Sequence, residues 1–327
     1  MYVELAGKLQ GEKLRKWEAL LLSTGLTPEE KPEKTVLVWE GEELLATGSR
    51  IGNLLKYIAV NPAHQGEDLT ATVLTGLRQD AFDFGHSHLF LYTKPENEWM
   101  FRSLFFYPIA KTKDVLLMES AQGGITEFLA TLPQNAASGK IGALVMNANP
   151  FTCGHAYLAE TAAKQCNWVY VFVLSEDKSD FSATDRLEMV RQGVSHLKNV
   201  TVLPTGPYLI SSATFPTYFL KDREKAGQVQ CLLDVEIFCK YFAPRFSVTH
   251  RFVGTEPLSP MTAQYNKILS ENLPKNGITL QEIPRLETQG IPVSASAVRA
   301  LIKEGKTIQH LVPETTYRYL KEHNLCK

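Results

Sequence analysis

The sequence predicts two domains, an α+β domain followed by an α/β domain built on a doubly wound parallel sheet. First, its 327 residues exceed the roughly 150 residues of an average domain. Second, 44% of the residues are hydrophobic and 21% are charged, which is typical of packed globular interiors and not of disordered chains. Third, short β-type runs follow one another in the N-terminal part, whereas strands and helices alternate in the C-terminal part.

The first predicted domain, residues 1–122, is a meander of strands with helices around it. An amphipathic pattern predicts a helix over residues 11–24, and a polar, proline-containing segment follows. Gly41 and Glu42 fit a tight antiparallel turn between the first two strands. The later predicted elements are strands 35–40, 43–50 and 54–60, a helix that begins at Asn61 and Pro62, strand 88–93, a short helix 96–104 and a last strand near 114–120.

The second predicted domain, residues 140–327, follows a linker of small and polar residues at 123–139. Its strands are almost continuously apolar, as expected where helices cover both faces of a parallel sheet. This alternation predicts a Rossmann-like nucleotide-binding fold. The predicted strands are 141–147, 168–175, 199–204, 248–254 and 279–284, and the predicted helices begin near Gly154, Ala183, Gln264, Ser294 and Val312.

Charge and cysteine usage argue against several functional classes. The 34 Lys and Arg residues balance 35 Asp and Glu residues, so the net charge of −1 is too small to hold nucleic acid non-specifically. We see neither an export signal nor a run of about 18 apolar residues, and therefore expect a cytoplasmic protein without a membrane segment. The cysteines are odd in number and form no C-x-x-C pair, which argues against a disulfide framework and a structural zinc site; they are Cys153, Cys166, Cys231, Cys239 and Cys326.

The turn after the first strand of the second domain carries the strongest functional signal. It contains no G-x-G-x-x-G, and a chance G-K-T at residues 305–307 lacks the first glycine and the preceding strand of a Walker A loop. In the run 147–155, Thr152 offers a hydroxyl, Gly154 removes bulk, and His155 places an imidazole at a helix N-terminus. Free N–H groups and the helix dipole favour an anion there, so the turn predicts phosphate binding. The alternative is that Thr152 merely caps the helix and His155 packs.

A second signal lies near the C-terminus, where a helix opens with hydroxyl groups. Ser294 and Ser296 stand at its cap, and Arg299 follows in its first turns. This arrangement predicts a clamp for the outgoing phosphates, with the arginine neutralising charge that develops as the α-phosphorus is attacked. A serine-capped helix with a solvated arginine is the alternative interpretation.

Weaker candidates complete the predicted site. Arg186 either adds a phosphate contact or is an exposed helix arginine. Gly254 and Glu256 follow a strand on the ligand side of the sheet and either contact the nucleotide or form a plain turn. Cys153 sits at a helix N-terminus beside His155, where a thiol is expected to be acidified and could form an acyl-enzyme. We favour no such role for Cys153, because it occupies the variable position of T-x-G-H.

Together these residues resemble the nucleotidyltransferase superfamily that carries T/H-x-G-H and a C-terminal S-x-S/T-x-x-R motif. The combination of NPFTCGH and VSASAVR, behind an acetyltransferase-like domain, resembles the citrate lyase ligase family over essentially the whole chain. The resemblance implies that Thr152, His155 and Arg299 are catalytic. It also implies that the nucleotide is bound by Asn149, Pro150, Phe151, Gly154, Ser294, Ser296, Arg186, Gly254 and Glu256, with no dedicated protein metal site.

By this resemblance the enzyme is a ligase that forms a thioester. ATP and acetate would give acetyl-adenylate and pyrophosphate, and the acetyl group would pass to the thiol of the prosthetic group on the acyl carrier subunit of citrate lyase. The prosthetic group is a phosphoribosyl-dephospho-CoA, and its acetylation activates the lyase. Mg²⁺ is expected on the phosphates, held largely by ATP and water.

The first domain resembles the GNAT N-acetyltransferases, whose acetyl-CoA loop follows a central strand as Q/R-x-x-G-x-G/A. The matching run begins at Gln65, but Asp68 and Thr70 replace both expected glycines. Side chains then stand where backbone N–H groups would approach a pyrophosphate, and Asp68 would repel it. We therefore expect this domain to recognise the CoA-like prosthetic arm or the carrier rather than to turn over acetyl-CoA.

Two other functions compete with the ligase. A small-molecule adenylyltransferase would use the same phosphate clamp on a phosphomonoester acceptor, which needs extra cationic groups near the α-phosphate, whereas acetate needs only a small pocket. Alternatively, the first domain is an active N-acetyltransferase and the second a nucleotide sensor. Acetyl-CoA binding at residues 65–70 would favour that arrangement.

Overall fold

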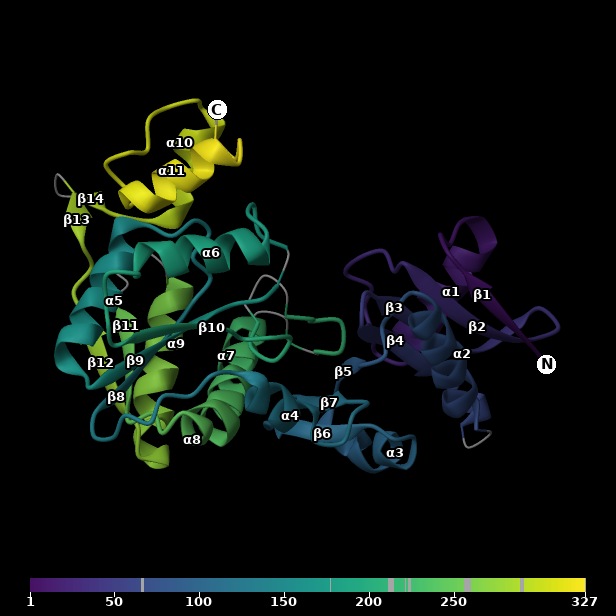
Figure 1. The fold of residues 1–327 in the computed structure, drawn as a ribbon. Helices are drawn as coiled ribbons and strands as arrows, with labels where there is room; N and C mark the ends of the chain where they lie inside the picture. The colour runs from purple at the N-terminus through teal and green to yellow at the C-terminus, as the bar shows by residue number, and fades with distance from the viewer. Residues whose placement is uncertain are drawn as a thin grey trace. The chain divides into compact units, whose positions relative to one another are not determined.

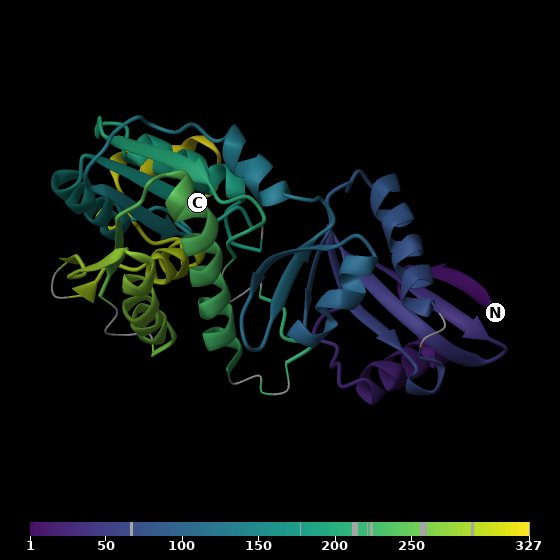
Figure 2. The ribbon, with the colours of Figure 1, turned by 90° about the horizontal axis from the view of Figure 1, so that it is seen from below.

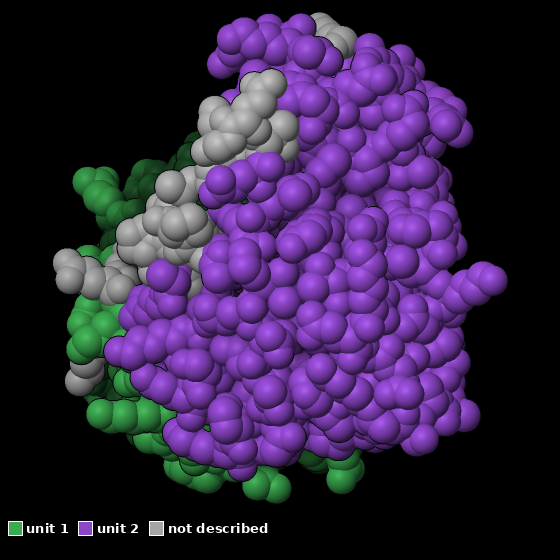
Figure 3. Space-filling view, turned by 90° about the vertical axis from the view of Figure 1, so that its left-hand side faces the viewer, with its two compact units in different colours: residues 1–124, 216–229 green, residues 125–215, 230–327 purple. Residues whose placement is uncertain are grey.

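A computed structural model describes residues 1–65, 68–176, 178–210, 215–220, 222, 225–255, 260–288 and 291–326 (Figure 1). The chain divides into two compact units. Unit 1 comprises Met1–Gly124 and Pro216–Val229, and unit 2 comprises Ile125–Phe215 and Gln230–Lys327 (Figure 3). The predicted linker 123–139 thus falls almost wholly within unit 2, and unit 1 includes a later segment that the sequence analysis assigned to the second domain.

Unit 1 is built on a seven-stranded sheet in the order β1-β2-β3-β4-β5-β7-β6 (Figure 2). All neighbouring strands are antiparallel except β4 and β5, which are parallel. The strands are β1 (Tyr2–Ala6), β2 (Lys34–Glu40), β3 (Glu43–Ile51), β4 (Leu54–Val60), β5 (Phe90–Thr93), β6 (Tyr107–Lys111) and β7 (Leu116–Glu119), and the helices are α1 (Gly11–Ser23), α2 (Leu69–Asp83) and α3 (Glu98–Ser103), with short 3₁₀ turns at Pro62–His64 and Pro95–Asn97.

The predicted meander and its helices are confirmed, with three differences. The helix expected from Asn61 is a 3₁₀ turn followed by α2, since the two segments do not join. The sequence analysis missed β1, whose residues are mostly exposed and therefore show no buried apolar run. It also missed β6, in which Pro108 interrupts the β-type pattern.

Unit 2 contains a five-stranded parallel sheet in the order β10-β9-β8-β11-β12. All five predicted strands and the doubly wound architecture are confirmed. The strands are β8 (Ile141–Met146), β9 (Trp168–Val173), β10 (Val200–Pro204), β11 (His250–Gly254) and β12 (Thr279–Ile283). The strand order reverses beside β8, so the carboxyl ends of β8 and β11 form the topological switch point at which such sheets bind ligands.

The remaining helices and strands belong to unit 2, apart from residue 124 and residues 226–229 at the start of two of the helices, which belong to unit 1. They are α4 (Gly124–Thr131), α5 (Cys153–Gln165), α6 (Ala183–Gly193), α7 (Ala226–Ile237), a π-helical turn (Phe238–Phe242), α8 (Ala243–Arg245), α9 (Pro260–Asn272), a 3₁₀ turn (Pro274–Asn276), the two-stranded β13 (Glu287–Thr288) and β14 (Ile291–Pro292), α10 (Ala295–Lys303) and α11 (Glu314–Glu322). Within the described ranges, no helix combines the length and apolar character needed to cross a membrane.

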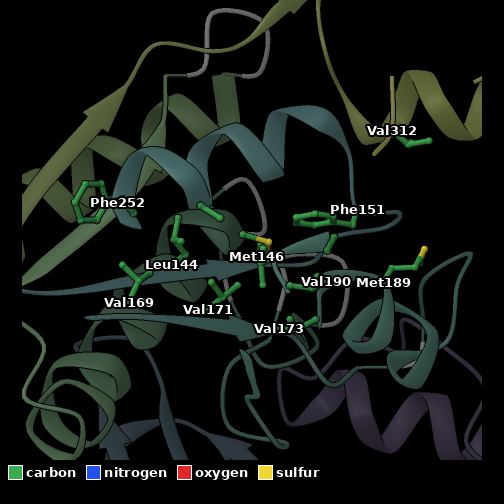
Figure 4. Close-up of a cluster of buried hydrophobic side chains, with 14 of the residues drawn as sticks. Leu144, Met146, Phe151, Val169, Val171, Val173, Met189, Val190, Phe252 and Val312 are labelled. Atoms are coloured by element: carbon green, nitrogen blue, oxygen red, sulfur yellow. The ribbon is translucent and has the colours of Figure 1, made fainter. Parts of the chain in front are cut away.

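The residues of β9 show how the sheet is buried on both faces. Val169, Val171 and Val173 point into a core shared with α5, α6, α10 and α11 (Figure 4). The alternate residues Tyr170 and Phe172 point to the opposite face, where the ring of Phe172 meets aromatic rings of the π-helical turn. Burial on both faces explains why these strands are uninterrupted apolar runs.

Phe151, in the turn that follows β8, is fully buried in this core and packs beneath the carboxyl end of the sheet. Its ring stacks on the imidazole of His155, with centroids 5.7 Å apart and planes 15° from parallel. Gly193, at the end of α6, makes room for it: a Cβ there would lie 2.3 Å from a ring carbon of Phe151. The absence of a side chain on α6 therefore fixes where Phe151, and with it His155, can sit.

Replacement of Gly193 by alanine should destabilise unit 2. Overpacking a core costs about 1–3 kcal/mol, while the gain in helix propensity over glycine is at most about 1 kcal/mol. We expect the free energy of unfolding, measured by urea denaturation, to fall by about 1–2 kcal/mol. Gly254→Ala is the matched control, because no atom of the described residues lies within 4 Å of its Cβ position. Equal stabilities of the two variants would contradict the packing argument.

Candidate nucleotide-binding site

The turn from β8 to α5 is held by reciprocal hydrogen bonds around Thr152. Thr152 is the N-cap of α5, and its Oγ1 accepts the backbone N–H of His155 at 3.4 Å. In return, the backbone N–H of Thr152 donates to Nδ1 of His155 at 3.0 Å. The cap expected in the alternative interpretation is therefore present. It also gives the imidazole a fixed orientation at the switch point of the sheet.

The hydrogen bonds of His155 assign the tautomer of its neutral ring, and the shift of its pKa gives the charge state that the sequence left open. Because Nδ1 accepts a hydrogen bond from the backbone of Thr152, the proton of the neutral ring resides on Nε2. Burial of the ring and the positive charge of Arg285 lower the pKa of His155 to about 4. At neutral pH the residue is a neutral N–H donor rather than a cation.

The second motif, at the N-terminus of α10, contacts the first motif, in the turn from β8 to α5. Ser294 caps α10, with its Oγ accepting the N–H of Ala297 at 3.2 Å, and the hydroxyl of Ser296 lies 3.2 Å from that of Ser294. Arg299 donates from Nη1 to the carbonyl of Asn149 at 2.6 Å, across 150 residues of sequence. Its Nε pairs with Asp180 at 3.0 Å. The interpretation of Arg299 as a solvated arginine is therefore wrong.

Gly154 lies where the two helix N-termini approach each other. A Cβ on Gly154 would be 3.4 Å from the carbonyl oxygen of Val293, the residue before the cap of α10, and 3.6 Å from Oγ1 of Thr152. These are ordinary contact distances, and the backbone conformation is not one that requires glycine. The fold thus tolerates a methyl group at 154, which leaves room for a ligand as the stronger reason for glycine.

The structure excludes one of the two interpretations of Arg186, the exposed helix arginine, because its side chain is fully buried. Its Nη1 donates to the carbonyls of Asn147 and Leu174 at 2.9 and 2.7 Å, and its Nε donates to that of Phe181 at 3.1 Å. The guanidinium joins the segments that follow β8 and β9, and we assign it to positioning the turn.

The remaining predicted site residues are Gly254, Glu256 and Cys153. Gly254 ends β11 at the ligand edge, and its carbonyl accepts a hydrogen bond from Asn266 at 3.0 Å. Glu256 lies outside the described residues. The expected acidification of Cys153 is wrong, because burial raises the pKa of its thiol. The thiol is half-buried, so desolvation of the thiolate outweighs the helix terminus.

Two charged residues at this edge were missed by the sequence analysis. Asp180 holds Arg299, as described above, and no sequence pattern marks it. Arg285 follows β12, and its backbone N–H donates to Oγ1 of Thr255, just past β11, at 3.1 Å. Its charge acts on His155. The rule that ligands bind beyond the carboxyl ends of parallel strands could have identified Arg285.

Unit 1 contains a separate cavity of about 710 Å³ where β4 and β5 diverge. These strands pair only through Leu54 with Phe90 and Leu55 with Leu91. Beyond that point, Tyr57 adopts a positive φ of 58° and the pairing of β4 with β3 shifts register, which marks a β-bulge. The bulge bends β4 away and opens the sheet.

The walls of this cavity are largely apolar. Besides β4 and β5 it is lined by α2, α3 and two later aromatic residues of unit 1, Tyr218 and Phe219. The hydroxyl of Tyr218 donates to the carbonyl of Tyr92 at 2.9 Å. Gln65, Asp68 and Thr70 of the acetyltransferase-like run also line it, whereas Gly66 and Glu67 lie outside the described residues. Asp68 precedes α2 with a φ of 52° and makes no side-chain cap.

The fold and the paired motifs of unit 2 define a nucleotidyltransferase-type α/β protein. Sequence comparison is more specific: a sequence model of the citrate lyase ligase C-terminal domain matches residues 141–320. The [citrate [pro-3S]-lyase] ligase of Klebsiella pneumoniae is 42% identical over 89% of this chain and 87% of its own length. That of Escherichia coli strain K12 is 38% identical over 95% and 91%. The chain belongs to the citrate lyase ligase family.

Adenylyltransferases are more distant relatives. The phosphopantetheine adenylyltransferase of Symbiobacterium thermophilum is 26% identical over 53% of this chain and 90% of its own length. That similarity covers about half of the chain, so it leaves part of this chain without a counterpart in that enzyme. The full-length similarity to the ligases therefore outweighs it.

We predict that His155 stays neutral, with its proton on Nε2, from pH 8 down to about pH 5. The folded pKa of about 4 lies below the ordinary value of about 6.5. The unfolded chain therefore binds more protons between these values, and the contribution of His155 to stability is present above pH 6.5 and falls as the pH drops through this window. Long-range ¹H–¹⁵N NMR of the imidazole rings reports both tautomer and titration.

The His155 signal is assigned by its disappearance in His155→Gln. A protonated Nδ1, or a titration midpoint near 6.5, would contradict the tautomer and the pKa shift respectively. Thr152→Val offers a second check. It removes the hydroxyl but keeps the backbone donor, so the tautomer should persist.

Proposed function

We propose that this protein activates citrate lyase by acetylating its acyl carrier subunit. In this reaction ATP, acetate and the thiol of the carrier's prosthetic group yield AMP, pyrophosphate and an acetyl thioester. The observation that carries the proposal is the bond from Arg299 to Asn149, which brings both phosphate-binding motifs to one edge of the sheet. Membership of the citrate lyase ligase family supplies the substrate class.

The first step is the attack of acetate on the α-phosphorus of ATP, which forms acetyl-adenylate. Thr152 and the Nε2–H of His155 would donate to phosphate oxygens, while Arg299 offsets the charge that builds on the leaving pyrophosphate. The imidazole and the guanidinium are fixed before the substrate arrives, because the backbone N and Oγ1 of Thr152 lie 3.0 and 2.9 Å from Nδ1 of His155 and Arg299 is anchored on Asn149. To donate to a phosphate oxygen, the hydroxyl of Thr152 would turn away from Nδ1. Fixed donors stabilise developing charge without reorganising during the reaction.

The N-termini of α5 and α10 add backbone donors for the phosphates. α5 has 13 residues and α10 has 9, enough for each to present a positive dipole end. At α5 the N–H of Cys153 already donates to the carbonyl of Leu311 and that of His155 to Oγ1 of Thr152, so only the other N–H groups of its first turn are available to a phosphate. Asn149, Pro150 and Phe151 shape the approach to α5, Gly154 leaves space for the nucleotide, and the hydroxyls of Ser294 and Ser296 face the same phosphates. Gly254 and Glu256 remain candidates for the nucleoside end.

Magnesium would enter on the nucleotide. Among the described residues, no three His, Cys, Asp or Glu side chains gather to hold a metal ion. Asp180, a carboxylate in contact with both motifs, is already paired with Arg299. A Mg²⁺ ion would be held by phosphate oxygens and water, and its bound charge would neutralise part of the triphosphate.

The second step needs no protein nucleophile. The acetyl group would pass directly from the adenylate to the carrier thiolate, with AMP as the leaving group. Cys153 is the nearest protein thiol to His155 in sequence, and its raised pKa disfavours the thiolate that an acyl-enzyme would require. All five cysteines are free, which fits a reducing compartment such as the cytoplasm.

The cavity of unit 1 is our proposed site for the prosthetic arm, a phosphoribosyl-dephospho-CoA that ends in a thiol. Its apolar walls and the diverging backbones of β4 and β5 suit an extended chain that contains amide groups. Asp68 and Thr70 stand where acetyl-CoA-binding loops have glycines, which disfavours tight binding of a pyrophosphate there. This division assigns phosphate chemistry to unit 2.

We predict that the enzyme exchanges labelled pyrophosphate into ATP only when acetate and Mg²⁺ are present, before any carrier is added. Formation of acetyl-adenylate is reversible, so exchange reports that step alone. His155→Ala should lower the exchange rate more than it weakens ATP binding, if Nε2–H acts mainly in the transition state. Exchange assays with a panel of short carboxylates and isothermal titration with ATP measure the two effects.

Gly154→Ala is the matched probe of the nucleotide space. It should unfold at the wild-type temperature and yet bind ATP poorly, whereas Gly254→Ala keeps most of the affinity if Gly254 is only a turn.

Pyrophosphate exchange that occurs without acetate would contradict the adenylate step. Adenylylation of a phosphomonoester in place of acetate would instead support the adenylyltransferase function.

A filled cavity in unit 1 should weaken the use of the carrier and leave adenylate formation intact. Ala71 lines the cavity on α2, so Ala71→Trp is expected to raise the KM for reduced carrier. Asp83→Trp, at an exposed position at the far end of the same helix and not among the residues that line the cavity, should leave the KM unchanged. An unchanged KM in both variants would refute carrier recognition by this cavity.

A further inference from the structure

Asp180 touches both phosphate-binding motifs. It lies between β9 and α6, and its Oδ2 is 3.0 Å from Nε of Arg299 and 3.5 Å from Nδ2 of Asn149. Its Oδ1 is 3.3 Å from Nζ of Lys303, one helical turn beyond Arg299 on α10. A single carboxylate therefore joins the turn after β8 to the helix that carries the second motif.

The guanidinium of Arg299 is fixed by two acceptors at different edges. Nε pairs with Asp180, and Nη1 donates to the carbonyl of Asn149 at 2.6 Å. Asn149 is itself held, because its side-chain oxygen accepts the backbone N–H of Phe181 at 3.2 Å, next to Asp180 in the chain. Two anchors define the plane of a guanidinium, whereas one leaves it free to rotate.

We propose that Asp180 is a positioning residue that presents Arg299 to the polyphosphate of ATP. The inference rests on the proposed function for the identity of the ligand. Asp180 itself is an anion at an anion-binding edge, so it disfavours ATP by direct charge repulsion. Its benefit to ATP binding therefore acts through Arg299, and that distinguishes positioning from simple attraction.

Asp180 is charged under working conditions. Although desolvation acts in the opposite direction, the neighbouring Lys303, Arg299 and Asn149 lower the pKa of its carboxyl group. Lys303 is 74% exposed, so its own pair with Asp180 is a weak surface interaction. We expect Lys303→Gln to change ATP affinity little, which leaves Arg299 as the residue through which Asp180 acts.

A double-mutant cycle tests this on the full chain. Asp180→Asn should raise the Kd for ATP about three- to tenfold, in the range of coupling between groups in contact. In the Arg299→Ala background the same substitution should have no effect or tighten binding slightly, because only the repulsion remains. Kd values come from isothermal titration with ATP, and pyrophosphate exchange rates are measured in parallel.

Two further variants and the wild-type protein serve as controls. Glu160→Gln makes the same carboxylate-to-amide change on α5, where Glu160 pairs with His196 at 3.4 Å, and should leave the Kd unchanged. Asp180→Ser replaces Asp180→Asn if the latter unfolds at a lower temperature. Equal effects of Asp180→Asn with and without Arg299 would overturn the inference. Wild-type protein that binds ATP but shows no acetate-dependent exchange would refute the proposed reaction and leave the cycle valid, whereas wild-type protein that binds no ATP would overturn both.

Discussion

The hydrogen bond from Arg299 to the carbonyl of Asn149 is the constraint on which the candidate site depends. A polyphosphate needs hydrogen-bond donors on more than one side, and a single helix N-terminus supplies donors on one side only. The parallel sheet fixes where the turn after β8 ends, and this bond fixes where α10 begins relative to that turn. Because the two segments lie 150 residues apart, the site exists only in the folded unit.

The same edge is organised from inside by a buried cation. Arg186 is fully buried, and its donors bind main-chain carbonyls at the ends of β8 and β9 and in the segment before α6. An uncompensated charge in the interior would be strongly destabilising, so these carbonyls must stay in place once the arginine is buried. The arginine thus holds the shape of the turn, while Phe151 supports the imidazole from the core. Stability and ligand binding share these residues.

Local patterns predicted what is local, and long-range contacts decided the rest. The five strands of unit 2 were predictable because each is an apolar run, and both motifs were visible because capping residues follow strands. The segment 216–229 was not, since its place in unit 1 rests on contacts such as that of Thr217 with Glu29, 188 residues away. Asp180 gives no local signal either. Arg186 was detected, yet its role depends on carbonyls that no sequence pattern reveals.

The neutral state of His155 affects how the candidate site could catalyse a reaction that is both rapid and reversible. A cationic imidazole would attract ATP, adenylate and pyrophosphate alike. Such uniform attraction lowers the free energy of every bound state and leaves the barriers between them unchanged. A neutral N–H donor held by Thr152 gains most when charge accumulates on the oxygen that it faces. The full positive charge then resides on arginine, and Arg299 is already balanced by Asp180. In the proposed reaction, this ion pair would limit the attraction of Arg299 for the bound product, pyrophosphate, and would keep the donors aligned for the transition state.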